Sequence, residues 1–157
     1  MQLRTTIKPG DIGAVIRLHG ILYAQEHQLD QTFEGYVAAG IGEFIKAYNP
    51  ATDCLWLAEK DDEIVGSIAI VGQPDRTAQL RWFLVHPDAR GGLGRELLRA
   101  AIQFCREHAF KSVFLWTVSE LHVAAHLYTQ AGFVKTEQKT HHIWGKERTE
   151  ERYNLVL

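Results

Sequence analysis

Hydrophobic and polar positions repeat with two different periods along this chain, and each change of period marks an expected element. Alternation with a period of two, or a short apolar run, predicts strands. These strands are residues 3–7, 54–60, 63–71, 78–85, 112–117, 133–144 and 152–157. Apolar residues spaced by three or four positions predict helices. These helices are residues 11–26, 33–45, 97–105 and 121–130.

The order of these elements predicts a mixed sheet with helices packed on both of its faces. Asp61-Asp62 predicts a tight hairpin, and Pro87 ends the preceding strand because proline cannot donate a hydrogen bond to a ladder. Asp11 is the expected cap of the first helix, and Gly132 is the expected left-handed residue that ends the last one.

Chain length and charge restrict the classes of protein. The 157 residues can bury one core but are too few for two ordinary domains, and without a repeat or linker one domain is expected over residues 1–157. A net charge of −2 lacks the basic excess that nucleic-acid binding requires. Residues 11–53 hold six acids and two cations, whereas residues 90–111 hold five cations and two acids. These segments could attract a cation and an anion respectively, or both could be solvated surfaces.

Cys54 and Cys105 lie in separate apolar stretches without CxxC spacing, so buried thiols in a reducing cytoplasm are expected rather than a disulfide or a nucleophile. The first eleven residues do not form a signal peptide, and no apolar run reaches transmembrane length. The expectation is a cytoplasmic protein with no membrane partner. His141 and His142 are not expected to bind a metal, because adjacent residues on a strand face opposite sides.

The stretch LRWFLVHPDARGGLGRELL (80–98) combines a strand, a proline, a glycine-rich turn and the start of a helix. Glycines let backbone N–H groups approach an anion, and the positive end of the following helix points toward it. The pattern predicts a phosphate or pyrophosphate site, although three neighbouring glycines also occur in tight turns. Neither the P-loop motif nor GxGxxG is present, which disfavours a P-loop kinase and a Rossmann dinucleotide site.

The segments VHP (85–87), RGGLG (90–94) and LL (97–98) together resemble the acetyl-CoA-binding motif of the GNAT acetyltransferases. A second block, AxxLYxxxGF (124–133), resembles the final helix and strand of that family. The spacing of the two blocks and the order of the elements fit as well, so the resemblance covers essentially the whole chain. Four segments are most similar to the GNAT domains fused to MarR-type regulators, here without a DNA-binding half: 19–27, 80–85, 115–117 and 141–146.

The resemblance implies the GNAT fold, an α/β (α+β) arrangement of about seven mostly antiparallel strands flanked by about four helices. It also implies acetyl-CoA as co-substrate and no metal, and members of the family are often homodimers. Leu84 and Val85 would offer backbone groups to the pantetheine arm and the acetyl group, where their strand separates from its neighbour. The turn would surround the pyrophosphate. The cofactor-binding residues expected from the resemblance are Leu84, Val85, Arg90, Gly91, Gly92, Leu93, Gly94, Arg95 and Thr117.

Two positions depart from the family pattern. The family loop is commonly written RGxGxG, and counting back from Gly94 places Ala89 rather than Arg90 at its first position, so the turn is one residue shorter. An asparagine that many relatives carry seven residues before the tyrosine is Leu121 here. This change removes a side-chain hydrogen bond to the pantetheine arm.

The resemblance assigns Tyr128 as the general acid facing the CoA sulfur. A phenol with a pKa of about 10 can protonate a leaving thiolate with a pKa of about 8.5. The acceptor ammonium must also lose a proton, and His19, Tyr23 and Glu26 are spaced to share one helical face. Glu26 is the expected ammonium contact or base, directly or through water, and His19, Tyr23 and Glu34 are the expected substrate-binding residues. Each could instead be a satisfied polar group at the edge of the core.

The sequence therefore predicts an N-acetyltransferase that transfers acetyl from acetyl-CoA to a primary amine of a small molecule or a protein. Direct attack in a ternary complex is expected, because no cysteine is placed to form a covalent acetyl-enzyme. The alternatives are a non-catalytic acetyl-CoA sensor and a transferase for a longer acyl-CoA. A sensor would need neither Tyr128 nor the polar helical face, and their presence favours an enzyme.

Overall fold

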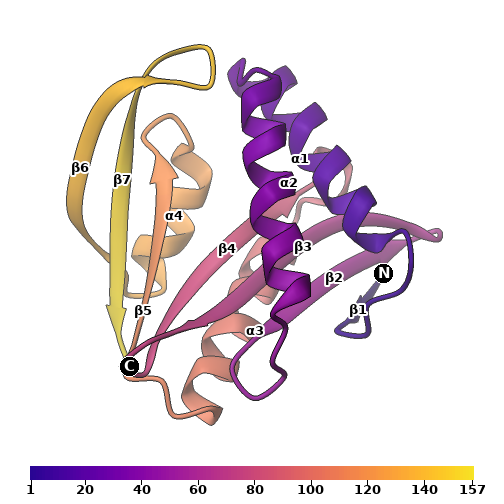
Figure 1. Ribbon diagram of the computed structural model, residues 1–157, viewed down its shortest axis with the longest axis vertical. Helices are drawn as coiled ribbons and strands as arrows, with labels where there is room; N and C mark the ends of the chain where they lie inside the picture. Colours follow the sequence, from indigo (N-terminus) through magenta and orange to yellow (C-terminus); the bar gives the residue numbers. More distant parts are fainter.

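A seven-stranded sheet with the order β1-β2-β3-β4-β5-β7-β6 forms the centre of the computed structural model, which describes residues 1–157 (Figure 1). The strands are β1 (Gln2–Arg4), β2 (Cys54–Lys60), β3 (Glu63–Gln73), β4 (Thr77–Val85), β5 (Ser112–Val118), β6 (Val134–Ile143) and β7 (Lys146–Val156). The helices are α1 (Asp11–His27), α2 (Gln31–Lys46), α3 (Leu93–Glu107) and α4 (His122–Gln130), with a 3-10 turn at Pro87–Ala89. All neighbouring strands are antiparallel except β4 and β5. The predicted element order and mixed sheet are confirmed.

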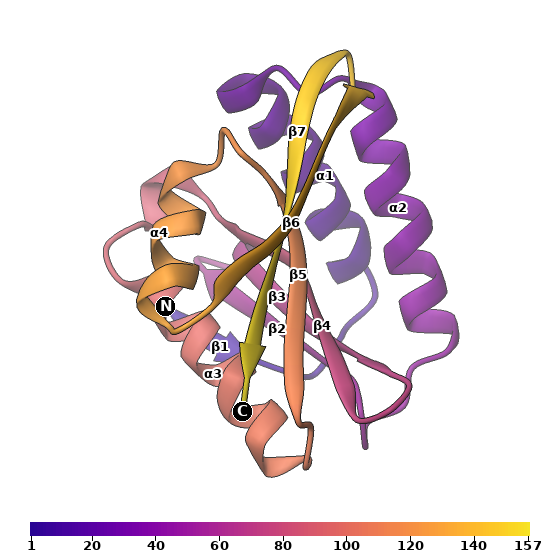
Figure 2. The ribbon, with the colours of Figure 1, turned by 90° about the vertical axis from the view of Figure 1, so that its left-hand side faces the viewer.

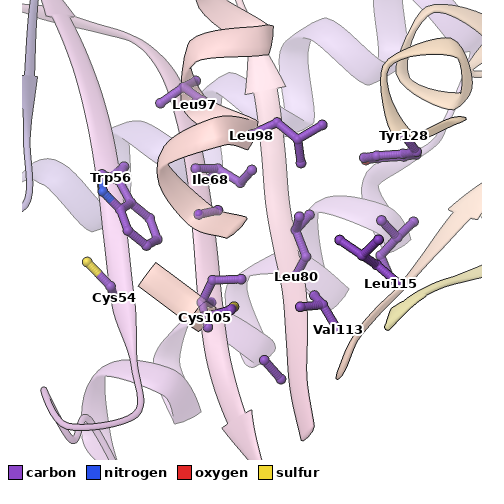
Figure 3. Close-up of a cluster of buried hydrophobic side chains, with 14 of the residues drawn as sticks. Cys54, Trp56, Ile68, Leu80, Leu97, Leu98, Cys105, Val113, Leu115 and Tyr128 are labelled. Carbon is purple, nitrogen blue, oxygen red and sulfur yellow. The ribbon is translucent and has the colours of Figure 1, made fainter. Parts of the chain in front are cut away.

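Helices cover both faces of the sheet, α1 and α2 on one side and α3 and α4 on the other (Figure 2). The larger core lies under α3, where Leu97, Leu98 and Cys105 pack over Ile68 and Leu80 of the sheet (Figure 3). A second core lies between the sheet and the first two helices. It contains Val15, Leu29, Phe33, Val37, Ile41, Phe44, Leu55, Leu57, Ala69 and Trp82. None of the helices is long and apolar enough to cross a membrane.

Both cysteines are buried free thiols, as predicted. Burial raises the pKa of Cys54 to about 11 and that of Cys105 to about 12. At neutral pH both sulfurs are therefore protonated, and neither lines a cavity of the site described below. The structure gives them a packing role.

Strands β4 and β5 are hydrogen-bonded neighbours over only a short distance. Residues 77–79 of β4 pair with residues 112–114 of β5, and beyond them the two strands diverge (Figure 1). β5 pairs along its whole length with β7 instead. The sheet is thus split into a large part, β1 to β4, and a smaller part, β5 to β7, with an opening between them.

A bulge interrupts β4 on the side of this opening. The register with β3 shifts between Ser67 and Ala69, and Trp82 opposite the shift has φ of 51°. A bulky residue with positive φ costs roughly 1–3 kcal/mol, which the surroundings must offset. Ser67 helps to do so, because its hydroxyl donates a 2.7 Å hydrogen bond to the Trp82 carbonyl from a fully buried position.

The predicted start of the chain needs two corrections. β1 ends at Arg4 rather than at residue 7, because the Arg4 guanidinium donates to the Thr6 carbonyl and to the Asp11 carboxylate, which turns the chain toward α1. Asp11 is not the cap of α1. Gly10 occupies that position with φ of 94°, and Asp11 is the first helical residue.

Among the later element boundaries, two were predicted correctly and two were not. Asp61 and Asp62 form the predicted hairpin, both with positive φ, and Gly132 ends the last helix region with φ of 101°. The strand predicted to reach residue 144 stops at residue 143, where Trp144 and Gly145 make a two-residue turn. β7 consequently begins at residue 146, six positions before the predicted start. Its first half is charged and lacks the apolar alternation that identifies a strand.

Candidate active site

Two cavities meet where β4 leaves β5. The larger, with a volume of about 300 Å³, lies between α1, β4, the glycine turn and α4, and is called here the glycine-turn cavity. The other, of about 120 Å³, lies between α1, α2, β4, β5, α4 and β7, and is called the aromatic cavity. Tyr23, Phe83, Leu121 and Ala124 line both cavities. A molecule bound in one can therefore reach a molecule bound in the other at these four residues.

The glycine turn has the geometry of an anion site. Gly91 and Gly92 have φ of 128° and 111°, and apart from their immediate chain neighbours no atom lies within 4 Å of the position where a side chain would begin. The first α3 hydrogen bond is donated by Glu96 N–H to the Gly92 carbonyl, and the amides at 93–95 have no partner in the chain. These N–H groups and the positive helix end are free to bind an anion.

The structure gathers most of the predicted cofactor-binding residues around one cavity. Those that line the glycine-turn cavity are Leu84, Val85, Arg90, Gly91, Gly92, Gly94 and Arg95. Leu93 does not line it, because its side chain is buried in the core under α3. Thr117 differs as well, since it lies on β5 and lines the aromatic cavity.

The two predicted acceptor-side carboxylates lie outside the aromatic cavity. Glu26 lines the glycine-turn cavity, where both of its oxygens accept from Arg90 Nη2 at 3.1 and 3.0 Å. Glu34 lines neither cavity and packs against Gly20, where an added Cβ would overlap the Glu34 carboxylate. The expected face of His19, Tyr23 and Glu26 is thus divided between the cavities.

His19 is buried in the wall of the aromatic cavity with only 2% of its surface exposed. Its Nδ1 lies 2.8 Å from the Val15 carbonyl, which can only accept, so Nδ1 carries the proton. Nε2 is consequently a free lone pair, and it has no partner. Burial lowers the pKa of His19 to about 4, so the ring is neutral at physiological pH. His19 can therefore accept a hydrogen bond from a molecule in this cavity.

Tyr128 lies on α4 in the wall of the aromatic cavity, with its ring 5.9 Å from that of Phe83. Only 5% of the residue is exposed, and its hydroxyl makes no hydrogen bond within the chain. Burial raises the Tyr128 pKa far above its ordinary value, and the neighbouring hydroxyls of Tyr23 and Tyr153 act in the same direction. Tyr128 is thus a neutral O–H donor placed beside the junction of the two cavities.

Sequence analysis missed two charged residues of the aromatic cavity, Arg81 and Glu150. Glu150 lies on β7 and accepts a hydrogen bond from His141 Nε2 at 2.5 Å. It was missed because the predicted strand began only at residue 152. Arg81 lies within a correctly predicted strand. Alternation alone predicts the side of the sheet on which a side chain lies, but not the residues that it contacts.

A third missed residue, Arg148, stabilises the wall of the aromatic cavity by hydrogen bonds. Only 3% of the residue is exposed, and its guanidinium donates to the carbonyls of His27, Gln28 and Trp144. It also forms an ion pair with Glu120. The β6–β7 turn is thereby fixed over the end of α1, which places the Trp144 ring in the cavity wall.

Comparison with known proteins agrees with this geometry. The sequence pattern of the acetyltransferase (GNAT) family matches residues 21–133. Human N-acetyltransferase 8B is 30% identical over 113 residues, which are 68% of this chain, and the match spans about half (50%) of that relative's length. Mycothiol acetyltransferase of Cellulomonas flavigena is 34% identical over 91 residues, which are 51% of this chain and 26% of that protein.

Solved structures show the same fold. An acetyltransferase from Streptococcus agalactiae superposes with a TM-score of 0.77 at 24% identity, covering 99% of this chain and 98% of that one. A Salmonella typhimurium protein solved with its cofactor acetyl-CoA has a TM-score of 0.73 at 18% identity, covering 100% and 94%.

The buried, neutral His19 predicts a pH dependence of stability. The unfolded chain binds a proton at His19 below a pH of about 6.5, whereas the folded protein resists that proton until about pH 4. Stability is therefore complete above this window and falls as the pH falls through it. Between pH 7.5 and pH 5 the parent should lose about 2 kcal/mol more than His19→Gln. Urea unfolding measures this difference, and equal losses in both proteins would contradict the neutral assignment.

Proposed function

The chain belongs to the acetyltransferase (GNAT) family, and we propose that it transfers the acetyl group of acetyl-CoA directly to a primary amine. The observation that carries the proposal is the junction of two cavities at Phe83, beside the unpaired hydroxyl of Tyr128. One cavity has an anion-binding turn and suits the cofactor. The other is apolar with a few polar groups, as expected for a small organic acceptor.

The residues of the glycine-turn cavity fit acetyl-CoA. The free amides at 93–95 and the charges of Arg90 and Arg95 suit its pyrophosphate, and the empty space at Gly91 and Gly92 admits it closely. Apolar side chains continue the cavity toward the junction and suit the pantetheine arm; they include Leu84, Val85, Val123 and Leu127. Bound there, acetyl-CoA supplies the activated acetyl thioester.

The bulge of β4 changes the direction of the backbone N–H groups near the junction of the two cavities. The register shift leaves Trp82 and Phe83 without regular partners in β3, Leu84 and Val85 pair again with Ser67 and Gly66, and on the other side β5 has already diverged. The backbone N–H groups of residues 83–85 that face the opening are proposed to polarise the acetyl carbonyl. Thr117 is proposed to contact the acetyl group of the cofactor from the aromatic cavity, on the side of the acceptor.

Tyr128 is proposed to donate its proton to the CoA sulfur as the carbon–sulfur bond breaks and the nitrogen–carbon bond forms. Its raised pKa opposes full ionisation, but the same burial disfavours a thiolate, so the sulfur in this cavity is also a better proton acceptor. The tyrosine can then be reprotonated by the proton that leaves the amine. The products are an amide and CoA with a free thiol.

Glu150 replaces Glu26 as the proposed carboxylate for the acceptor ammonium. Glu150 lines the aromatic cavity, whereas Glu26 lies beside the glycine turn. We assign Glu150 to attract the ammonium and pass its proton to water, and the neutral His19 to accept a hydrogen bond from the amine. Glu26 instead holds Arg90, so it competes with the pyrophosphate for that guanidinium.

Two finer expectations from the sequence concern the domain organisation and the nearest group of relatives. Residues 1–157 are proposed to act as one domain, which is supported by the continuous sheet from β1 to β6. The expected relation to GNAT domains fused to MarR-type regulators is not supported by the relatives named above, which are other proteins of the family.

Gly92→Asp should prevent tight acetyl-CoA binding. It adds a carboxylate against the pyrophosphate, and like charges about 4 Å apart repel by about 1–4 kcal/mol, so affinity should fall by about tenfold or more. Gly10→Asp is a matched control, because Gly10 is also a left-handed residue before a helix with open space around it. Calorimetric affinities that are equal in the two variants would place the cofactor elsewhere.

Tyr128→Phe should lower the single-turnover rate by about 10²–10⁴-fold, as for a positioned general acid, with acetyl-CoA affinity nearly kept. Tyr153→Phe is the control, because Tyr153 is a buried neighbour of Tyr128 that lines neither cavity. Rates for Tyr128→Phe equal to those of the parent would remove this hydroxyl from the mechanism.

Glu150→Gln and Glu26→Gln should have opposite signatures in steady-state kinetics. Loss of the Glu150 charge should raise the acceptor KM by about tenfold and leave acetyl-CoA binding unchanged. Loss of the Glu26 charge should release Arg90 and tighten acetyl-CoA binding without changing the acceptor KM. The reverse pattern would restore Glu26 as the acceptor contact and remove Glu150.

A further inference from the structure

Arg81 is a cation in the aromatic cavity that has no carboxylate partner. None of the ion pairs of the protein includes it. Its guanidinium carbon lies 4.5 Å from the centre of the Trp82 ring and 5.8 Å from that of Tyr36. One nitrogen, Nη2, donates to the Tyr36 hydroxyl at 3.3 Å. The side chain is therefore fixed between two rings while most of its donors are unused.

The fold makes specific room for this guanidinium. A Cβ at Gly40 of α2 would lie 2.9 Å from Arg81 Nη2 and 3.1 Å from Trp82 Cζ2. Successive residues of a regular strand point to opposite faces, yet both side chains reach the same helix because the β4 bulge lies here. Arginine held by aromatic rings is a preorganised fork for a carboxylate.

The other groups of the cavity complement an amine that also carries an anion. Glu150 supplies a negative charge from β7, and His19 supplies an unpaired lone pair from α1. Fifteen of the 20 lining residues are hydrophobic, so the rest of the ligand is apolar or aromatic. A ligand with only positive charges, such as a polyamine, would meet the repulsion of Arg81.

Arg81 also lies close to the point of reaction. It precedes Phe83, which borders both cavities, by two residues. In an extended strand two residues span roughly 6.6 Å, and the bulge shortens this. A guanidinium attached to the backbone at residue 81 can bind a carboxylate that is close to the reacting nitrogen of the acceptor.

We infer that the acceptor is an amino acid with an apolar or aromatic side chain, its carboxylate bound by Arg81 and its amine directed to the acetyl group. The inference rests on the proposed function and specifies its substrate class. The ammonium loses one proton to water, the amine nitrogen bonds to the acetyl carbon, and the carbon–sulfur bond of acetyl-CoA breaks. The nitrogen then loses a second proton, which replaces the one that Tyr128 gives to the sulfur. The products are an N-acetyl amino acid and CoA thiol.

The test measures CoA thiol release with apolar and aromatic amino acids, each paired with its amide and its decarboxylated amine. The parent should use the amino acids with a kcat/KM at least about tenfold above that of either partner, as expected for a hydrogen-bonded charge pair. Arg81→Gln should lower kcat/KM for the amino acids by about 10–100-fold and should not lower that for the amides, which have no carboxylate to lose. Arg81→Lys, which keeps the charge but not the fork, should lie between them.

Arg99→Gln is the matched control, because Arg99 is exposed on α3 and has no ion pair. Calorimetric binding of acetyl-CoA to every variant shows that the protein is folded. Equal use of amino acids and amides by the parent, or a preference that survives in Arg81→Gln, would overturn the inference while acetyl transfer stands. If acetyl-CoA binds but no amine releases CoA thiol, the proposed function itself is wrong.

Discussion

The separation of β4 from β5 is the constraint on which the rest of this structure depends. Three residue pairs join these strands, and beyond them the hydrogen-bonding groups of β4 face an opening instead of a neighbour. Both cavities lie along this opening, and they meet at Phe83. A continuous ladder would leave no space for a thioester between the two parts of the sheet. Arg148 stabilises the open arrangement, because it fastens the β6–β7 turn to the end of α1.

Burial beside this opening keeps the titratable rings of the cavity walls neutral. It raises the pKa of Tyr128 and of Tyr23, the latter to about 12, and lowers that of His19 to about 4. Two hydroxyl donors and one lone-pair acceptor therefore surround the junction without a charge of their own. Arg81 and Glu150 are the only charged residues that line the aromatic cavity. The cavity therefore has one group that can bind an anion and one that can bind a cation. Such a site selects a ligand by the arrangement of its charges.

Local sequence rules predicted much of the fold and most of the residues that line the turn side of the glycine-turn cavity. The glycine turn could be found because positive φ and amides without partners occur close together in sequence, as at Gly91 and Gly92. Glu26 and Glu34 could not be placed, because helical spacing gives the direction of a side chain but not the partner that it meets. Glu150 was missed because its strand begins in a charged segment, where pairing with β6 rather than apolar alternation defines the structure.

A crystal structure of the protein with CoA and an apolar amino acid tests the central claim most directly, that the opening between β4 and β5 joins a cofactor site to an acceptor site. The account predicts the pyrophosphate on the amides at 93–95, the sulfur between Phe83 and Tyr128, and the amino group on the far side of Phe83. A sulfur remote from Tyr128, or CoA and the amino acid bound in the same cavity, would contradict it.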